Sequence, residues 1–198
     1  MHCTGPPEAV GIVLAGGRSS RMGRDKADVE WRPGQTLLAR AVELAEAAGC
    51  AHVIVSGRRP GYDHVVDRSP GAGPLGGIES VLAERRAALA GRLLLVVPLD
   101  MPLLTGATLK RLLDAGRAST RGAMHANGPL PLAVWCSEAL HAAVRRVMST
   151  GRKRSLGELA SLAALDVLPE APEAEMANVN RRDELAELRR CAAGIPTD

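Results

Sequence analysis

The sequence predicts an α/β fold, a three-layer α/β/α sandwich with a mostly parallel sheet as its middle layer. Short, almost wholly apolar segments have the length of buried strands, and segments with helical periodicity lie between them. Apolar strands that alternate with helices are typical of a parallel sheet covered on both faces. In addition, polar motifs follow the strands, at the sheet edge where such folds bind ligands. In the first half we predict strands at 9–14, 52–56, 64–66 and 92–97 and helices at 35–48, 74–90 and 105–115.

The second half is less regular, but nothing in it marks a second domain. It contains no internal repeat and no linker to a further domain. We therefore predict a single domain over residues 1–198, with one half ending near residue 115 and the other covering about 116–190. In the second half we predict strands at 122–125, 131–135 and 165–168, helices at 137–148, 155–162 and 182–190, and a loop at 169–175.

The composition disfavours several classes of function. With two Trp, one Tyr and no Phe among 198 residues, the chain lacks the aromatic rings on which single-stranded nucleic acids stack. The net charge of +3 is mild, and the densest basic cluster, Gly151–Arg154, is short, whereas nucleic-acid binders carry a stronger basic face. We therefore expect a small polyanionic substrate and no nucleic-acid partner.

The cysteines and the apolar segments indicate the compartment. Cys3, Cys50, Cys136 and Cys191 are far apart and match no zinc-binding spacing, so we expect free thiols in a reducing compartment. No apolar run approaches the roughly 18 residues of a membrane span, and no signal peptide is evident. We expect a cytoplasmic protein without a membrane partner, and we expect it to be a monomer.

The loop after the first predicted strand is the most specific feature of the sequence. Gly16 and Gly17 allow the backbone to approach a ligand closely, and successive N–H groups in such a turn can surround phosphate oxygens. The loop matches neither the Walker A motif nor the dinucleotide fingerprint. We interpret it as a phosphate-binding loop, the alternative being a solvated basic loop. Four cations follow the glycines, namely Arg18, Arg21, Arg24 and Lys26.

Asp100 follows the most apolar of the predicted strands, in Val97-Pro-Leu-Asp-Met-Pro102. A carboxylate at the ligand edge suits Mg²⁺, which proteins commonly hold with one or two carboxylates plus the phosphates of a substrate. The alternative is an aspartate that caps a helix or a turn.

Two further segments are candidates for anion binding. The glycine- and proline-rich segment from Asp67 to Gly77 leads into a predicted helix, whose first N–H groups are unpaired. The segment from Gly151 to Ser155 offers three cations and a residue that can cap a helix. The alternatives are a plain connecting loop for the first and a solvated charged run for the second.

These motifs, taken in order, resemble those of the molybdenum cofactor guanylyltransferases. Leu14-Ala-Gly-Gly-Arg-Ser-Ser-Arg-Met-Gly-Arg-Asp-Lys26 is similar to the LAGGxSxRMGxDK motif of that family. Gly73-Pro-Leu-Gly-Gly77 is similar to its GPLxG segment, and Pro98-Leu-Asp-Met-Pro102 to its PCDxP segment. Asn178-Val-Asn180 with Asp183-Glu-Leu185 resembles its NVNTPEDL ending. The ordered matches span residues 10 to 188.

The resemblance implies a fold, a reaction and a set of roles. The fold is a Rossmann-like sheet of the nucleotide-diphospho-sugar transferase type, with residues 1–115 binding the nucleotide and 116–190 the acceptor. The reaction joins GTP and molybdenum-molybdopterin into the guanine dinucleotide and pyrophosphate. Molybdenum-insertion proteins or apo-molybdoenzyme chaperones would be further partners.

The same resemblance assigns residues to roles. Arg21, Lys26 and Asp100 would be catalytic, with Asp100 also holding Mg²⁺ and Arg21 neutralising the triphosphate. The implied nucleotide-binding residues are Leu14, Ala15, Gly16, Gly17, Lys26, Ser56, Asp67 and Asp100. The implied acceptor-binding residues are Arg152, Arg154, Ser155, Asn178 and Asn180.

The chain departs from the family pattern at three places. It has Ser56 where the family often has Asn, Leu130-Pro131 in place of His-Pro, and Arg181-Arg182-Asp183 in place of Pro-Glu-Asp. Two alternatives stay open on the sequence alone. One is a cytidylyl-, uridylyl- or other nucleotidyltransferase that acts on a pterin, sugar or polyol phosphate. The other is a molybdopterin carrier protein without catalytic activity, although such a carrier has no need of the carboxylate at position 100.

Overall fold

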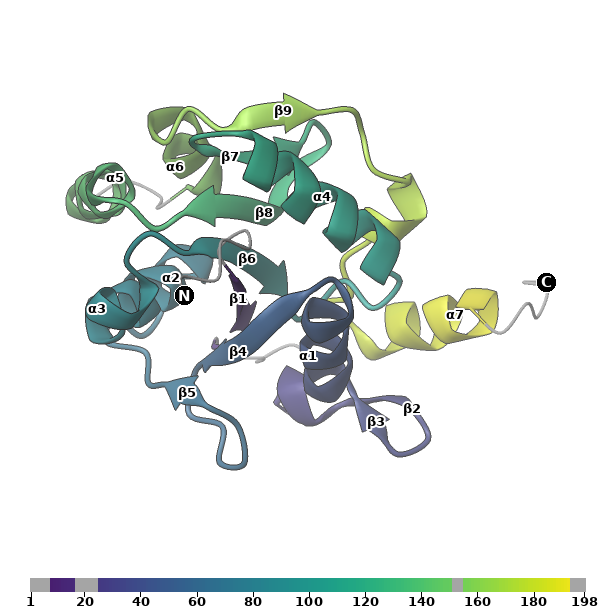
Figure 1. The fold of residues 1–198 in the computed structure, drawn as a ribbon. Helices are drawn as coiled ribbons and strands as arrows, with labels where there is room; N and C mark the ends of the chain where they lie inside the picture. The colour runs from purple at the N-terminus through teal and green to yellow at the C-terminus, as the bar shows by residue number, and fades with distance from the viewer. Residues whose placement is uncertain (1–7, 17–24, 151–154, 193–198) are drawn as a thin grey trace, which may run out of the picture.

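One seven-stranded sheet passes through the middle of the molecule, as the computed structural model shows for residues 8–16, 25–150 and 155–192 (Figure 1). All neighbouring strands run parallel except β8, which is antiparallel to both its neighbours. The predicted mostly parallel sheet is therefore confirmed. In sheet order, the strands are β5 (His64–Val65), β4 (Cys50–Ser56), β1 (Ala9–Leu14), β6 (Leu93–Pro98), β8 (Gly128–Trp135), β7 (Gly122–His125) and β9 (Asp166–Leu168).

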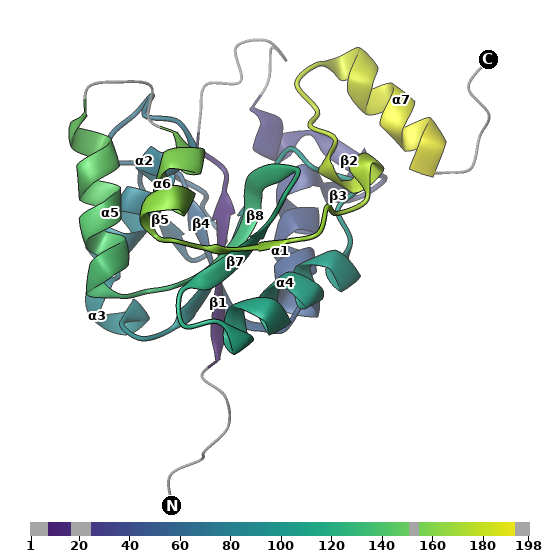
Figure 2. The same cartoon turned by 90° about the horizontal axis from the view of Figure 1, so that it is seen from above.

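Helices cover both faces of the sheet, so the predicted three-layer α/β/α sandwich is confirmed (Figures 1 and 2). Side chains alternate between the two faces of each strand: in β1, Val13 packs into the core on the side of α1 and α4, whereas Ile12 packs into the core on the side of α2 and α5. The helices are α1 (Leu37–Ala47), α2 (Pro74–Glu84), α3 (Arg86–Leu89), α4 (Gly106–Ala118), α5 (Glu138–Ser149), α6 (Leu156–Leu162) and α7 (Arg182–Ala192).

Four smaller features differ from the sequence-based expectations. The helix expected from Gln35 starts at Leu37, because Gln35–Thr36 form a short strand, β3, and the Thr36 hydroxyl caps the helix. This strand pairs with β2 (Glu30–Arg32) in a hairpin that we did not predict. Its Pro33-Gly34 turn, with Gly34 at φ 77°, was the available signal.

The other differences concern helix boundaries. The helix expected over 74–90 is interrupted at Arg85, whose φ of −104° and ψ of 18° end α2 before α3 begins. Two 3₁₀ turns, η1 (Lys26–Asp28) and η2 (Glu173–Met176), lie where we expected loop. Leu130-Pro131, which departs from the family pattern, is a cis peptide bond.

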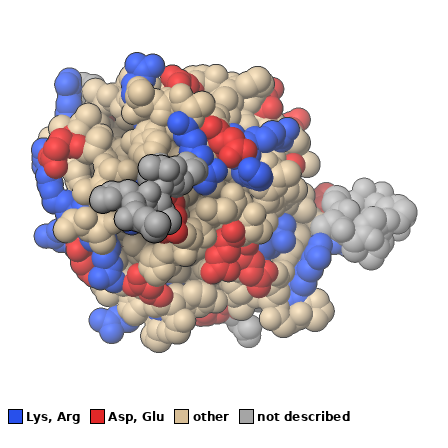
Figure 3. All heavy atoms as spheres, in the orientation of Figure 1, with Lys and Arg blue, Asp and Glu red and all other residues tan. Residues whose placement is uncertain are grey.

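The surface of the molecule carries charges of both signs (Figure 3). On the face seen in Figure 1, Lys and Arg side chains are interspersed with Asp and Glu, rather than gathered into one basic area (Figure 3). In the described part of the chain, no helix combines the length and the apolar character needed to span a membrane.

Candidate active site

Three adjacent strand ends define the edge of the sheet at which the predicted site residues lie. β1 lies between β4 and β6, and Leu14 at its end is in register with Ser56 on one side and Pro98 on the other. Because neighbouring strands lie about 4.8 Å apart, Ser56 and Pro98 are separated by roughly 10 Å. Figure 2 shows β1 running toward the edge where β2, β3 and α7 lie. The sheet therefore brings Leu14 and Ser56 to the same edge as Pro98, which lies two residues before Asp100.

On one side of β1, Gly16 lies against the carboxylate of Asp67. A Cβ atom on Gly16 would be 2.8 Å from Asp67 Oδ2 and 3.7 Å from Ser56 Oγ, so a larger residue would need the carboxylate to move. A Cβ on Gly77, in the first turns of α2, would overlap Ser56 Oγ. The two glycines thus let the backbone after β1 and the first turns of α2 approach Ser56 and Asp67 closely.

Ser56 is 1% exposed, and its hydroxyl has no hydrogen-bond partner within the ranges that the structure covers. A buried hydroxyl without a partner is costly to a folded protein, and sites of this kind often serve a ligand. Ser56 is the position at which the chain departs from the asparagine of the family pattern. The shorter side chain keeps a polar atom here and leaves room for the close approach of Gly77.

The Asp67 carboxylate is oriented by the buried residue Ser80. The Ser80 hydroxyl accepts a hydrogen bond from the backbone N–H of Arg68 at 2.9 Å. The same hydroxyl lies 2.8 Å from the carbonyl oxygen of Gly76 and 3.3 Å from Asp67 Oδ1, both of which can accept its proton. Ser80 thereby ties the segment after β5 to the first turns of α2 and keeps Asp67 beside Gly16.

On the other side of β1, Lys26 and Asp100 form an ion pair. Lys26 Nζ lies 3.3 Å from Asp100 Oδ2, and the two side chains are 15% and 30% exposed. The ammonium also donates to the carbonyl oxygen of Val179 at 2.6 Å and to Asn180 Oδ1 at 3.2 Å. Two predicted catalytic residues and one predicted acceptor-binding residue therefore meet at one point, although they lie up to 154 positions apart.

The C-terminal segment is fixed at this point by its own backbone. Val179 is fully buried, and its N–H donates to the carbonyl oxygen of Asp100 at 2.8 Å. The Glu184 carboxylate accepts from the N–H groups of Asn180 and Arg181 at 2.7 and 3.0 Å, which closes the turn that leads into α7. The Asn178-Val-Asn180 motif is thus held against the end of β6.

The remaining predicted residues are placed as follows. Gly17, Arg21, Arg152 and Arg154 lie outside the described residues. Ser155 caps α6, since its hydroxyl accepts from the N–H of Glu158 at 3.4 Å, and Asn178 is exposed.

Sequence reasoning missed Arg59. Its guanidinium lies 2.7 Å from the carbonyl oxygen of Ala15 and pairs with Asp25. The available signal was its position three residues after Ser56, on the connection that leaves the same edge of the sheet.

Asp100 is the carboxylate best placed for a metal ion at this edge. Within the part of the chain that the structure covers, no group of three or more His, Cys, Asp or Glu side chains could hold a metal by itself. A single part-exposed carboxylate at this edge nevertheless fits an ion such as Mg²⁺, because that ion keeps several waters and takes oxygen ligands from the phosphates of a substrate. The donor set therefore fits a metal ion that arrives with a triphosphate.

The buried cysteines are free thiols that take no part in this site. Cys50 and Cys136 are both unpaired and buried, which agrees with the expected free thiols for these two residues. Burial raises the pKa of Cys50 to about 12, so the thiol stays protonated at neutral pH. Burial also raises the pKa of Cys136, whose sulfur lies 3.8 Å from His141 Nε2.

Comparison with known proteins identifies relatives over most of the chain. Residues 11–172 match the family model described as "MobA-like NTP transferase domain". A molybdenum cofactor guanylyltransferase from Xanthomonas euvesicatoria is 52% identical over 103 residues, a match that spans about half of each protein. A probable molybdenum cofactor guanylyltransferase from Opitutus terrae is 39% identical over 146 residues, covering 69% of this chain and 71% of that protein.

A solved structure supports the fold independently. A nucleotidyl transferase from Methanothermobacter superposes with a TM-score of 0.68, covering 94% of this chain and 98% of that one, at 18% identity. At this identity the likeness concerns the fold alone, and it agrees with the Rossmann-like arrangement expected from the sequence.

Proposed function

The chain belongs to the family of MobA-like NTP transferase domains, and we propose that it transfers GMP from GTP to molybdenum-bearing molybdopterin, releasing pyrophosphate. The family expected from the motifs is thereby confirmed. The curated relatives named for guanylyl transfer support the choice of reaction. The first of these matches spans only about half of the relative's length.

The main support for this proposal is that Lys26 contacts both Asp100 and Asn180 beside the end of β1. Lys26 and Asp100 supply a cation and a carboxylate 3.3 Å apart, and Asn180 adds a neutral polar group to the same point. Across β1, Gly16, Ser56 and Asp67 lie in close contact with one another, and these three residues would contact the nucleoside. A nucleotide bound along this edge would extend from Ser56 and Asp67 toward Asp100, with its phosphates near Lys26.

The reaction needs no nucleophile from the protein. A terminal phosphate oxygen of molybdopterin attacks the α-phosphorus of GTP, a new P–O bond forms, and the bond to the β-phosphate oxygen breaks as pyrophosphate leaves. A phosphate is already an anionic nucleophile, so the task of the protein is to position the reactants and stabilise charge. Lys26 would stabilise the negative charge that develops on pyrophosphate, and Arg21 would neutralise the triphosphate.

We propose Mg²⁺ as the metal and Asp100 as the residue that holds it. When bound, the ion would neutralise phosphate charge and polarise the α-phosphate toward attack. Lys26 keeps the Asp100 carboxylate at the ligand edge through their ion pair. Asn180, which contacts Lys26, and the neighbouring exposed residue Asn178 would face the acceptor, as the family pattern implies.

The acceptor side is the less specified part of the site. Ser155 caps α6, and Arg152 and Arg154 precede it in the sequence. We propose these three residues as contacts for the phosphate of molybdopterin, on the strength of the family pattern and the positive charge of the two arginines.

Competition among nucleotides tests the choice of GTP. The protein is incubated with Mg²⁺, molybdenum-loaded molybdopterin and equal concentrations of GTP, CTP, UTP and ATP, and the products are separated and weighed by mass spectrometry. We expect the guanine dinucleotide and an equal amount of pyrophosphate. Formation of the cytosine dinucleotide would replace the guanylyl assignment by the cytidylyl one. Binding of molybdopterin without release of pyrophosphate from any nucleotide would favour the carrier.

A further inference from the structure

Arg59 connects the two ends of the segment that runs from the end of β1 to Lys26. Its Nη2 atom donates to the carbonyl oxygen of Ala15 at 2.7 Å and to Asp25 Oδ1 at 2.9 Å, so each of its two protons has an acceptor. The guanidinium also lies 2.8 Å from Asp25 Oδ2, which makes the contact an ion pair. The side chain is only 17% exposed. Charge-assisted hydrogen bonds of this kind are stronger than neutral ones, and partial burial protects them from screening by salt.

Asp25, the acidic partner of Arg59, starts the 3₁₀ turn that presents Lys26. Its Oδ1 atom accepts a hydrogen bond from the N–H of Ala27 at 3.0 Å, and the structure identifies it as the N-cap of η1. Lys26 is the first residue of η1, and its ammonium reaches Asp100 and the carbonyl oxygen of Val179. The carboxylate that Arg59 holds is therefore the one that fixes the backbone on either side of Lys26.

A glycine permits Arg59 to reach this position. Gly57 has a φ of 112°, in the left-handed region, and its backbone lies against the peptide between Ala15 and Gly16. A Cβ atom there would be 3.1 Å from the Ala15 carbonyl oxygen and 3.2 Å from the Gly16 nitrogen, both of which are backbone atoms that cannot rotate away. The β4–β5 connection can therefore lie directly beside the end of β1, two residues before Arg59.

We propose that Arg59 is a positioning residue for nucleotide transfer: by bridging the Ala15 carbonyl and the Asp25 carboxylate, it fixes the turn that presents Lys26 to the triphosphate. The inference rests on the proposed function, in that Lys26 is taken to contact the phosphates. Arg59 itself would act through Asp25 and η1. Both of its Nη2 protons already have protein acceptors, its Nη1 atom donates to the carbonyl oxygen of Arg58, and its Nε atom is buried.

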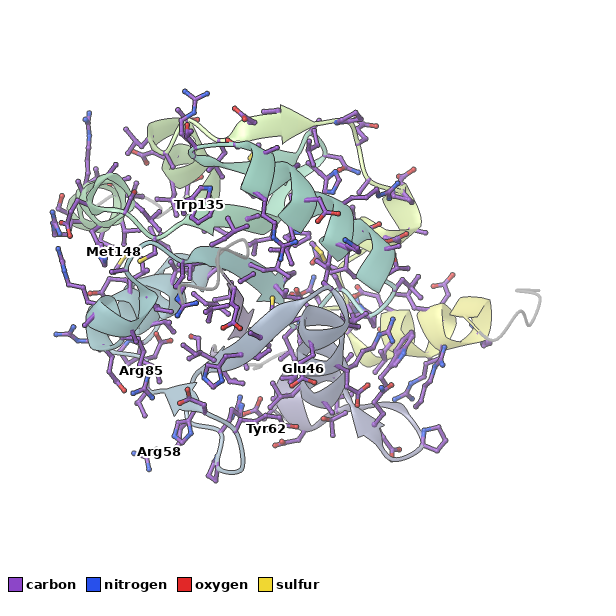
Figure 4. The ribbon with its side chains drawn as sticks, in the orientation of Figure 1. Glu46, Arg58, Tyr62, Arg85, Trp135 and Met148 are labelled. Atoms are coloured by element: carbon purple, nitrogen blue, oxygen red, sulfur yellow. The ribbon has the colours of Figure 1, made fainter. Side chains whose placement is uncertain are left out.

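The neighbouring residue supplies a matched control. Arg58 is exposed and extends away from the sheet into solvent (Figure 4). Arg58→Ala removes the same charge from the same connection without touching Ala15 or Asp25. Asp25→Asn is a second, milder variant, because asparagine caps a helix as well as aspartate does while losing the charge that pairs with Arg59. Arg59→Lys keeps the positive charge but replaces the planar guanidinium, with its several N–H donors, by an ammonium group.

The test measures the affinity for GTP with Mg²⁺ by calorimetry, together with kcat and KM for GTP. We expect Arg59→Ala to weaken GTP binding by about tenfold or more and to lower kcat, with an unchanged KM for the acceptor. Asp25→Asn should lower the GTP affinity and kcat by a smaller factor. Arg59→Lys should keep part of the GTP affinity that Arg59→Ala loses, and Arg58→Ala should bind GTP as tightly as the wild type. In a Lys26→Ala background, adding Arg59→Ala should cause no further loss, because the two residues act in series.

Hydrogen exchange gives a readout that does not depend on the reaction. The N–H of Ala27 should exchange faster in Arg59→Ala than in Arg58→Ala, since its acceptor on Asp25 is no longer held. Equal GTP affinity in Arg59→Ala and Arg58→Ala would overturn the proposal. A further loss of GTP affinity when Arg59→Ala is added to Lys26→Ala would also overturn it, because it would mean that Arg59 contacts the nucleotide itself. If the wild type binds GTP but forms no dinucleotide, the proposed function fails while these comparisons still decide the role of Arg59.

Discussion

At the scale of single residues, the site consists of two clusters of polar groups that three adjacent strand ends bring to one edge of the sheet. The sequence alone predicted Lys26 and Asp100 as candidates, because each follows a strand and carries the charge that phosphates or metals require. It could not predict that Lys26 also donates to Val179, since that contact joins residues 153 positions apart and involves a carbonyl oxygen, which every residue has. For the same reason the contact between Arg59 and the Ala15 carbonyl could not be predicted from the sequence, where the position of Arg59 three residues after Ser56 was the only signal we identify.

The ion pair of Lys26 and Asp100 leads to a prediction at this scale. Lys26→Ala and Asp100→Ala should each lower kcat for guanylyl transfer by on the order of 10²–10³, because in the proposed reaction each variant loses an electrostatic contact to the phosphates. Lys110→Ala is the control, since Lys110 pairs with Asp114 on the exposed side of α4. Turnover is followed as release of pyrophosphate at saturating Mg²⁺, with circular dichroism to check the fold. Near-normal turnover in either site variant would contradict the assignment.

At the scale of elements, the sequence predicted nearly all long helices and strands, because their apolar periodicity is continuous. Four short elements were missed, namely β2, β3, η1 and η2, which contain two to four residues each, too few to show a period. The equally short β5 and β9 were predicted at 64–66 and 165–168. Their positions depend on contacts with distant segments. Arg189 of α7, for example, donates to the Trp31 carbonyl oxygen in β2 at 3.0 Å.

The start of α4 shows how a distant turn completes an element. Glu175 in η2 accepts from both the N–H and the hydroxyl of Thr105, the residue that caps α4, at 3.1 and 2.9 Å. Glu175→Ala should lower the free energy of unfolding by about 1–2 kcal/mol, because a helix end loses its charged acceptor. Glu173→Ala, at an exposed position of the same turn, should change it by less than about 0.5 kcal/mol. Urea denaturation measures both, and equal losses would contradict the capping role.

At the scale of the whole molecule, the sheet joins the two halves that the sequence distinguished. β8 runs antiparallel between β6 and β7, so the sheet continues from the first half into the second. The C-terminal segment then returns to the first half, where Val179 and Asn180 contact Asp100 and Lys26. The single domain, the monomeric state and the insertion or chaperone partners stay predictions, to be tested in solution with the intact protein.

A buried histidine on the opposite side of the sheet from α1 predicts how the stability of the molecule depends on pH. Burial, together with the charge of Arg86, lowers the pKa of His141 below its ordinary value of about 6.5. The unfolded chain therefore takes up a proton near pH 6.5 that the folded protein resists. The stability due to neutral His141 is present above that pH and is lost as the pH falls through the lowered pKa.

Urea denaturation between pH 8 and pH 5 tests this dependence. The free energy of unfolding of the wild type should fall more steeply below about pH 6.5 than that of His141→Gln, which has no titrating group at this position. The comparison is between slopes, so a constant loss of stability in the variant does not affect it. Equal slopes in the two proteins would contradict the assigned protonation state of His141.

The central claim is that the edge formed by β4, β1 and β6 transfers the α-phosphate of GTP, with its guanosine, to a phosphorylated pterin. Labelling tests it most directly: the protein is incubated with Mg²⁺, molybdenum-loaded molybdopterin, and GTP that carries ³²P at either the α or the γ position. We expect the α label to enter the dinucleotide and the γ label to be recovered in pyrophosphate. Transfer of the γ label to the acceptor, or an α label that never leaves the GMP, GDP or GTP fractions, would contradict it.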